Sequence, residues 1–381
     1  MGDDEATRGR AVIAAPYLSG KAIGGGEHEA LCVAEALRDI GFKVSLICGA
    51  EPDFRELRRQ LGIDNPVSEI FTIRHETPKV IPRLFRKLST PLCIPNVKSR
   101  LYMNLDVDRR PFLIPLSTLL DDEIPVIYYF INAAINPLWR TKLGGRGDLR
   151  RFYRVILAKA VSEVVKRIRR NGLLIAICGY TARKVEAACG MRPEVLYGAI
   201  EAQVYRWRGE EKEKFMVASG RLVPYKRFEF AIRAAKRLGR KLIILGAVRD
   251  REYYEALLRM IRAEGVEELV KILTNLPIEE RADILKRAKV FLHCSVEAFG
   301  KAVAESMAAG CIPVVPKEGG QSEYTLRELH YSSFEEMLQR IEEAFTAPAT
   351  LSRELSEKAM EFDKPRYKSR FIELLRDKGL I

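Results

Sequence analysis

The second half of the chain alternates between short apolar runs and amphipathic stretches, and this alternation restricts the possible fold more than any other feature. The short apolar runs predict buried strands at 215–219, 242–245 and 270–273. Between and after these runs, apolar residues recur at helical spacing, which predicts helices over 228–238, 251–263 and 277–288. Regular alternation with short loops is typical of a parallel sheet covered by helices on both faces.

The beginning of the chain has the same pattern. Residues 10–15 and 43–48 predict two strands, and the apolar spacing between residues 27 and 40 predicts the helix that joins them. This is a βαβ unit, the start of a Rossmann-like half. The loop before the helix contains Gly24-Gly25-Gly26 and does not match Gly-x-Gly-x-x-Gly, which argues against a dinucleotide-dependent dehydrogenase. A further buried strand is predicted at 173–178.

Length and composition predict a two-domain α/β protein. At 381 residues the chain exceeds what one hydrophobic core usually serves, and its 47% hydrophobic and 30% charged residues are typical of a folded soluble protein. The stretch from 192 to 212, with Pro193, Gly198 and Gly209, is expected to hold the linker. The predicted divisions are 1–195 for the first domain, 196–212 for the linker, 213–350 for the second domain and 351–381 for a C-terminal helix.

No apolar run approaches the ~20 residues of a membrane span, and the N-terminus lacks the apolar core of a signal peptide. The seven cysteines are scattered singly, which indicates buried thiols in a reducing compartment, and we expect a cytoplasmic protein. Neither the cysteines nor the four histidines are spaced as metal ligands, so no metal site and no cofactor are expected.

The most informative segment for function runs from Glu297 to Glu305, two carboxylates eight positions apart around Phe-Gly-Lys. Apolar runs at 289–294 and 311–315 flank it, which predicts the order strand, loop, helix, strand, with a helix from Phe299 to Gly310. The backbone N–H groups near Gly300 and Lys301 would then be unpaired at the helix start, where they suit an anion.

One carboxylate is therefore expected on each side of an anion site, Glu297 in the loop and Glu305 within the helix. Carboxylates accept hydrogen bonds from sugar hydroxyls and repel phosphates. A ligand with hydroxyls at both ends and phosphate in the middle fits this arrangement, and a nucleotide sugar has that structure. The alternative is an ordinary surface pair, because two of 51 acidic residues often lie eight apart by chance.

A second loop supplies cations. Gly220-Arg221 and Lys226 follow the strand at 215–219 and open the next helix, so this loop lies at the same edge of the sheet as Glu297. Arginine binds phosphate oxygens through forked hydrogen bonds and lysine acts as a point charge. Together they would stabilise the charge that grows on a departing nucleoside diphosphate, and we assign them, with Glu297, as catalytic residues.

With Glu-x7-Glu around Phe-Gly, the Gly319-Gly320 loop and Gly-Arg-x4-Lys, the chain resembles the retaining group 1 glycosyltransferases (family 4), which have the GT-B fold. The resemblance implies two Rossmann-like domains with parallel sheets that face each other across a cleft, and a last helix that crosses back to the first domain. It implies that Glu297 contacts the transferred sugar and Glu305 the ribose, and that the base lies against Asn275 and Leu276. Phe299, Gly300, Lys301, Gly319 and Gly320, with Gly25, Gly26 and His28 from the first domain, are the other substrate-binding residues expected.

The chain departs from the family pattern on the acceptor side. Many members carry a histidine at a strand end of the first domain, and here the equivalent position holds Ile131 or Asn132. His28, after the three glycines, is a candidate substitute, although a lone helix histidine is more often solvated or structural. Retaining transfer does not require the histidine, because the departing phosphate oxygen can itself take the acceptor's proton.

The net charge of +13 is concentrated in residues 1–200, which hold 31 Lys/Arg and 22 Asp/Glu. Residues 140–170 contain eleven of these cations and two acids, with an apolar helical face. That face can rest on an anionic membrane surface or pack on the domain's own sheet. No nucleic-acid motif is present, and aromatic residues do not interleave with the cations, so no nucleic acid is expected.

The sequence therefore predicts a retaining, metal-independent glycosyltransferase that uses a nucleoside-diphosphate sugar. Local resemblance at 251–255 and 314–320 to mannosyltransferases that extend lipid-linked oligosaccharides narrows this to GDP-mannose and a polyprenyl-phosphate-linked acceptor, with the protein peripheral on the inner face of a membrane. The alternatives are a nucleotide-sugar epimerase or phosphorylase of the same fold, or a binding protein without catalysis.

Overall fold

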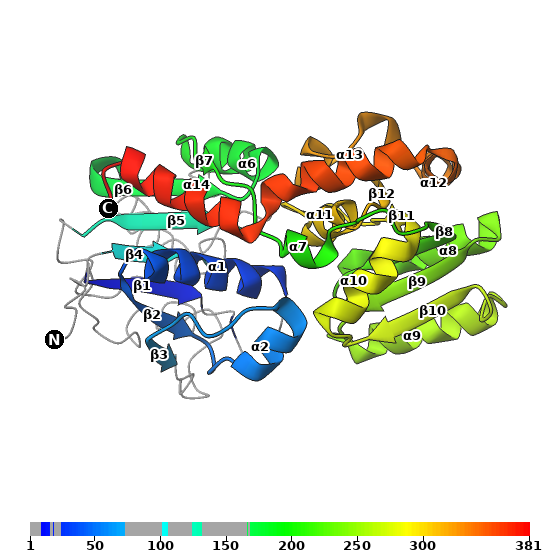
Figure 1. Cartoon of the computed structure of the whole chain (residues 1–381), viewed down its shortest axis with the longest axis horizontal. Helices are drawn as coiled ribbons and strands as arrows, with labels where there is room; N and C mark the ends of the chain where they lie inside the picture. The colour runs from blue at the N-terminus through cyan, green and yellow to red at the C-terminus, as the bar shows by residue number, and fades with distance from the viewer. Residues whose placement is uncertain are drawn as a thin grey trace, which may run out of the picture. The chain divides into compact units, whose positions relative to one another are not determined.

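The computed structural model describes residues 9–15, 18, 24–72, 101–105, 124–131, 166 and 168–381. The chain divides into two compact units (Figure 1). The first unit comprises Met1–Leu57, Ile63–Tyr197 and Tyr367–Ile381, and the second comprises Arg58–Gly62 and Gly198–Arg366.

In the described part of the first unit, seven strands form one sheet in the order β3-β2-β1-β4-β5-β6-β7, and every neighbouring pair is parallel. The strands are β1 (Arg10–Ala15), β2 (Lys43–Cys48), β3 (Glu69–Thr72), β4 (Leu101–Asn104), β5 (Val126–Phe130), β6 (Gly172–Ala176) and β7 (Glu194–Val195). The helices are α1 (Gly25–Asp39), α2 (Phe54–Leu61, whose last turn belongs to the second unit), α6 (Gly179–Cys189) and, from Tyr367 onward, α14 (Lys364–Asp377).

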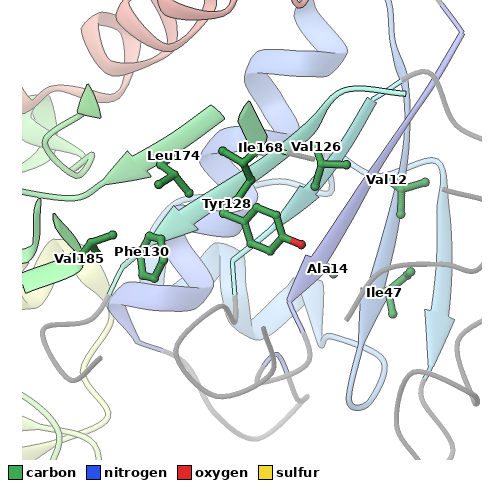
Figure 2. Packing of buried hydrophobic residues seen from close by; sticks show 9 residues of the cluster. All are labelled: Val12, Ala14, Ile47, Val126, Tyr128, Phe130, Ile168, Leu174 and Val185. Carbon is green, nitrogen blue, oxygen red and sulfur yellow. The ribbon is translucent and has the colours of Figure 1, made fainter. Parts of the chain in front are cut away.

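Buried apolar side chains from neighbouring strands hold this sheet together. Figure 2 shows nine of them in one cluster: Val12, Ala14, Ile47, Val126, Tyr128, Phe130, Ile168, Leu174 and Val185. Val185 comes from α6 and the others from strands or from the segment that precedes β6. The predicted βαβ unit is confirmed, with β1 and β2 at the expected bounds and α1 between them.

The last helix returns to the first unit, as predicted. Lys368 of α14 forms ion pairs with Asp39 and, at 3.8 Å, with Glu35, both on α1. Figure 1 shows these two helices of the first unit, α14 in red and α1 in blue. Lys378, just past the end of the same helix, pairs with Glu194 of β7 at 2.5 Å. The return begins only at Tyr367, because α13 (Ala349–Ala359) belongs to the second unit.

The second unit is a six-stranded parallel sheet in the order β10-β9-β8-β11-β12-β13. Its strands are β8 (Glu213–Ser219), β9 (Lys241–Gly246), β10 (Val270–Thr274), β11 (Ala288–Leu292), β12 (Ile312–Pro316) and β13 (His330–Tyr331). Its helices, besides α13, are α7 (Ala202–Tyr205), α8 (Phe228–Leu238), α9 (Arg251–Ala263), α10 (Ile278–Arg287), α11 (Lys301–Ala308) and α12 (Phe334–Thr346). Short 3₁₀ turns occupy Pro224–Lys226, Gly320–Glu323, Arg327–Leu329 and Met360–Phe362.

The predicted strand and helix alternation of the second half is confirmed. Helices α8 and α9 have the predicted bounds. Local chemistry explains why they begin and end there: the Asp250 carboxylate accepts a hydrogen bond from the backbone N–H of Tyr253 at 2.9 Å, and Gly239 ends α8 in the left-handed conformation.

Lys212, just before β8, connects the ends of two helices of the second unit. Its ammonium group donates to the carbonyl oxygen of Ala309 at 2.5 Å and to that of Leu285 at 3.4 Å, at the C-terminal ends of α11 and α10. The Leu285 carbonyl also accepts from the backbone N–H of Ala288 and from Cys311 Sγ, and a cation at the C-terminal end of a helix is favoured by the helix dipole. Burial lowers the pKa of Lys212.

Lys212→Met should therefore destabilise the second unit. Hydrogen bonds to a charged group contribute about 1.5–3 kcal/mol. At roughly 2–4 °C per kcal/mol, the melting temperature should fall by about 3–12 °C. Lys214→Met, which changes an exposed lysine two residues further on, within β8, is the control and should leave the melting temperature within about 1 °C. Equal melting temperatures for the two variants would contradict this assignment.

Candidate functional site

Four loops of the second unit carry the predicted site residues. They follow β8 (Gly220 to Arg227), β10 (Asn275 and Leu276), β11 (His293 to Gly300) and β12 (Lys317 to Gly320). All four strands are parallel, so their carboxyl ends lie at one edge of the sheet, the usual place for a ligand in this class of fold.

Two of the three predicted catalytic residues contact each other. Lys226 Nζ lies 2.6 Å from Glu297 Oε1, and the two side chains are only 12% and 22% exposed. Lys226 is the last residue of a 3₁₀ turn and its side chain runs over Gly220, where a Cβ would meet Lys226 Cε at 3.3 Å. Gly246 permits this loop to approach β9, since a Cβ there would lie 2.1 Å from the Gly220 carbonyl oxygen.

Arg221 belongs to the same loop but is exposed. Its guanidinium donates to the Tyr225 hydroxyl at 2.7 Å and lies 5.9 Å from the centre of that ring, while Lys226 Nζ lies 5.6 Å from the same centre. The two cations thus flank one tyrosine, itself 50% exposed. The pattern of cations in this loop predicted Arg221 and Lys226 but not Tyr225.

Glu297 is held at both its side chain and its backbone. Ser295 Oγ donates to Glu297 Oε1 at 3.1 Å, and the Glu297 backbone N–H donates to Gln321 Oε1 at 3.1 Å. The Glu297 carbonyl oxygen accepts from the backbone N–H of Gly320 at 2.8 Å. Burial alone would raise the pKa of Glu297, but Lys226, His293 and the Ser295 hydroxyl outweigh it and lower that pKa. Glu297 is therefore an ionised carboxylate at neutral pH.

His293 follows β11 and is buried. Burial, with the nearby charge of Lys226, lowers its pKa to about 4, so the imidazole is neutral at physiological pH. Its Nε2 lies 3.4 Å from Ser295 Oγ, and its ring stacks on Phe291 with 6.3 Å between centres. Because His293 follows a buried strand and directly precedes the Glu297 loop, we predict that it shapes this loop and does not react, and the geometry supports that prediction.

Helix α11 begins at Lys301, with Gly300 before it in the left-handed conformation at φ 82°. The Lys301 side chain donates to the Ala199 carbonyl at 2.6 Å. The Phe299 ring is buried against Tyr324 and Phe362, at 5.3 and 5.2 Å between ring centres. The carbonyls of Phe299 and Gly300 both accept from the Tyr324 hydroxyl. The side chain of Phe299 is therefore part of the core, and its predicted role in substrate binding stays a prediction.

Glu305 lies on α11 in a polar environment that the sequence did not reveal. Burial raises its pKa, and the charges of Arg281 and Lys301 oppose that rise. The charge of Glu305 in turn adds to burial in raising the pKa of Tyr205, whose buried hydroxyl has no hydrogen-bond partner among the described residues. Arg281 and Tyr205 come from α10 and α7, which no spacing in the sequence links to Glu305.

The remaining predicted residues of the second unit lie in the loops after β10 and β12. Asn275 has the left-handed conformation at φ 57° and donates its backbone N–H to the Gly246 carbonyl at 3.2 Å. Leu276, beside it, is half-buried. Gly319 has φ 121°, and a Cβ there would lie 2.3 Å from Gln321 Oε1. Gly320 opens the 3₁₀ turn that contains Gln321.

Three predicted residues belong to the first unit. Gly25 and Gly26 form the first turn of α1, after Gly24. His28 is buried in the same helix, with Nδ1 3.4 Å from Cys32 Sγ, which is a structural environment for a histidine. Ile131 is buried at the end of β5. Asn132, and all of 140–170 except residues 166 and 168–170, lie outside the described residues.

Ser295, Gln321 and Tyr225 are the site residues that the sequence analysis missed. Ser295 lies two residues before Glu297, and Gln321 follows Gly320 directly. This proximity to predicted site residues was the only signal in the sequence that could have identified them. No group of three or more His, Cys, Asp or Glu residues that could hold a metal ion occurs in the described part of the chain. In that part, no helix is both long enough and apolar enough to span a membrane.

The fold defines the class of protein. Two parallel sheets in Rossmann-like units, with a last helix that returns to the first unit, make a GT-B fold, as predicted. The chain is similar over 96% of its length to the crystal structure of Anabaena Alr3699/HepE in complex with UDP and glucose, with a TM-score of 0.69, 18% identity and 99% of that chain covered. It is similar over 97% of its length to the sucrose-phosphate synthase (tll1590) of Thermosynechococcus elongatus, with a TM-score of 0.72, 13% identity and 99% coverage.

Sequence comparison gives the family. Residues 201–357 match the family model of the "Glycosyl transferases group 1", and this part of the chain belongs to that family. A relative is the human GDP-Man:Man(3)GlcNAc(2)-PP-Dol alpha-1,2-mannosyltransferase, 33% identical over 119 residues, which are 28% of this chain and 24% of that protein. The chain thus spans about a quarter of the length of this curated relative.

Proposed function

We propose that this protein transfers a sugar from a nucleoside-diphosphate sugar to an acceptor hydroxyl, with retention of configuration. The observation that carries the proposal is the contact between Lys226 and Glu297 at the carboxyl edge of the second sheet, at 2.6 Å. One cation and one carboxylate, both largely shielded from water, are placed there on separate loops. In a nucleoside-diphosphate sugar the phosphate is bonded to the sugar. A group that binds the phosphate and a group that binds the sugar hydroxyls must therefore lie side by side, as these two do.

The roles follow from the chemistry of the donor. Its bond between the anomeric carbon and a phosphate oxygen breaks, and the pair of electrons leaves with the diphosphate. Lys226, Arg221 and the backbone N–H groups at the start of α11 would stabilise that growing negative charge. Glu297 would bind the sugar and offset the positive charge at its anomeric carbon, and Glu305 would accept hydrogen bonds from the ribose.

The acceptor's proton has a destination that needs no protein base. When the acceptor oxygen attacks from the face that the diphosphate leaves, the departing phosphate oxygen takes the proton. The new bond then forms on the same side as the old one, which is retention. The replacement of the family histidine by Ile131 or Asn132 is compatible with this route.

We further propose mannose from GDP-mannose as the donor and a polyprenyl-phosphate-linked acceptor at an anionic membrane surface. The name of the human relative, with its GDP-Man donor and PP-Dol acceptor, supports this choice. The excess of cations in residues 1–200 suits an anionic neighbour. The Anabaena structure was solved with UDP and glucose, so the base and the sugar both require testing.

A thermal-shift screen of nucleoside diphosphates and their sugars tests the donor site. A ligand present at 100 times its dissociation constant stabilises the folded state by about 2.7 kcal/mol. We expect GDP and GDP-mannose both to raise the melting temperature, and UDP to raise it less. Adenosine, which lacks phosphate, is the control. If no nucleoside diphosphate shifts the transition, the donor site is wrong. If UDP alone shifts the transition, the donor base is uracil and not guanine, and the assignment as a glycosyltransferase stands.

Turnover separates the proposed activity from its alternatives. A transferase consumes donor only when an acceptor other than water is supplied. An epimerase would convert the donor without an acceptor, a phosphorylase would require inorganic phosphate, and a binding protein would show the thermal shift without turnover. Donor consumption measured with and without a polyprenyl-phosphate-linked oligosaccharide distinguishes these cases.

A further inference from the structure

Two buried side chains beside Glu297, those of Ser295 and Gln321, have no role in the proposed chemistry and yet contact that residue directly. Both are almost fully shielded from solvent, with Ser295 3% and Gln321 0% exposed. Buried polar side chains are costly unless their hydrogen bonds are satisfied, so their presence beside one carboxylate requires an explanation.

The direction of the hydrogen bonds at Ser295 can be assigned. Its Oγ lies 3.1 Å from Glu297 Oε1 and 3.4 Å from His293 Nε2. An ionised carboxylate only accepts, so the single hydroxyl proton of Ser295 goes to Glu297. Ser295 can then only accept from His293, which places the imidazole proton on Nε2. Glu297 Oε1 thus receives both the Ser295 hydroxyl and the Lys226 ammonium.

Both the oxygen and the nitrogen of the Gln321 side-chain amide form hydrogen bonds. Its Oε1 accepts from the Glu297 backbone N–H at 3.1 Å, and its Nε2 donates to the carbonyls of Ser295 at 3.4 Å and Glu318 at 2.8 Å. It therefore joins the loop after β11 to the loop after β12. The space it fills exists because two neighbours lack a side chain: a Cβ on Gly319 would lie 2.3 Å from Gln321 Oε1, and one on Gly300 would lie 3.1 Å from Gln321 Cβ.

We propose that Ser295 and Gln321 are positioning residues that hold the Glu297 carboxylate, ionised and in one orientation, for the donor sugar. This inference depends on the proposed function for the identity of the ligand. Ser295 fixes one carboxylate oxygen, and Gln321 fixes the backbone from which the side chain extends. The charged and titratable groups that face Glu297 are Lys226, from the loop after β8, and His293, from the end of β11.

The first experiment is the pH profile of Ser295→Ala. Removal of a donor to the ionised form of a carboxyl raises its pKa, so the acid limb of the transfer rate should move to higher pH. At neutral pH, kcat should fall about 10-fold, and the affinity for the bare nucleoside diphosphate should stay within about two-fold, because Ser295 contacts no phosphate-binding residue. A Ser295→Ala profile that overlays the wild type would overturn the role of Ser295.

Ser356→Ala is the matched control. Ser356 is also a buried serine of the second unit, and its hydroxyl donates to the carbonyl of Ala308, the last residue of α11, at 2.6 Å and not to Glu297. Its loss should lower the melting temperature but leave kcat and the pH profile unchanged. A shift of the acid limb in this control as large as that in Ser295→Ala would show that loss of a buried serine, and not of the bond to Glu297, moves the profile.

Two substitutions of Gln321 test the amide. Gln321→Met keeps the size and removes every hydrogen bond. Gln321→Glu keeps an acceptor for the Glu297 N–H but sets a carboxylate oxygen against two carbonyl oxygens. Both should lower kcat by about 10- to 100-fold with nucleoside diphosphate affinity retained. If Gln321→Met does not fold, Gln321→Glu still provides the test, because protonation at low pH removes the repulsion between its carboxylate and the two carbonyl oxygens and lets the variant fold. Wild-type kcat in a folded variant would overturn the role of Gln321.

A measurement without turnover separates this inference from the proposed function. The carboxyl ¹³C resonance of Glu297, assigned by its loss in Glu297→Gln, can be titrated in the wild type and in Ser295→Ala. The Ser295→Ala midpoint should be higher. If the wild type transfers no sugar from any donor, the proposed function fails, and the titration alone then decides whether Ser295 holds the carboxylate. Equal midpoints would overturn the inference even in an active enzyme.

Discussion

Glu297→Gln should lower sugar transfer by about 100- to 1,000-fold and leave the nucleoside diphosphate bound. The substitution keeps the shape and the acceptor oxygen but removes the negative charge, which in the proposed mechanism offsets the positive charge at the anomeric carbon. Loss of one preorganised electrostatic contact of this kind costs about two to three orders of magnitude in kcat. The diphosphate meets Lys226 and Arg221, so its affinity should change little or rise, because Lys226 no longer has an anionic partner.

The measurement is kcat for transfer beside the dissociation constant of the bare nucleoside diphosphate. Glu342→Gln is the control, because Glu342 also forms an ion pair in the second unit, with Arg240 at 2.9 Å, but belongs to α12, away from the four loops of the site. It should leave both quantities unchanged. Transfer by Glu297→Gln within a few-fold of the wild type would remove Glu297 from the catalytic residues.

The second half of the chain was predictable because its elements are determined locally. Helices α8 and α9 have their apolar faces, their caps and their breakers within their own sequence, and their observed bounds equal the predicted ones. Parallel strands buried on both faces are short apolar runs, which are easily recognised when helices of regular length separate them.

Other elements were not predicted, and the reason is physical. Strand β3 has the burial pattern of an edge strand, exposed or half-buried at each of its four residues, so it lacks the continuous apolar run of a central strand. Helix α2 is largely charged and has few apolar residues to mark its face. Short or polar elements depend on neighbours distant in sequence, and no local pattern records that dependence.

The site shows the same division. The types of residue near Lys226 and Glu297 indicated phosphate and sugar chemistry, and the topology of a parallel sheet placed both loops at one edge. The role of Gln321 could not be predicted, because it depends on the space left by Gly319 and Gly300. Phe299 has a packing role that the motif did not indicate. Its place in the motif suggested a ligand contact, while its ring completes an aromatic cluster with Tyr324 and Phe362.

Lys226→Met should impair both binding and transfer, unlike Glu297→Gln. In the proposed mechanism Lys226 meets the diphosphate in the bound donor and more strongly in the transition state. We therefore expect the nucleoside diphosphate to bind about 10- to 100-fold more weakly and kcat to fall by about 100- to 1,000-fold. Isothermal titration with the bare diphosphate and initial rates with the sugar donor measure the two effects. Unchanged diphosphate affinity would remove Lys226 from the phosphate site.

The same variant has a pH-dependent effect on stability. In the wild type the pKa of Glu297 is lowered, so Glu297 contributes stability above its unfolded pKa and loses it as the pH falls through the folded pKa. Without Lys226, burial dominates and raises the pKa of Glu297 in the folded state above its value in the unfolded state. The ionised carboxylate then destabilises the fold at neutral pH, and protonation in acid removes this destabilisation. The difference in melting temperature between wild type and Lys226→Met should thus be largest near pH 7.5 and shrink toward pH 4.5.

An exposed pair of equal length provides the control. Lys236 Nζ lies 2.6 Å from Glu264 Oε2, as close as Lys226 lies to Glu297, but the two side chains are 51% and 34% exposed. Solvent screens such a pair, so Lys236→Met should change the melting temperature little at either pH. Removal of one partner from a shielded pair costs about 3 kcal/mol because the remaining charge is left without compensation. Equal losses for the two lysines would show that water, and not Lys226, stabilises the Glu297 carboxylate.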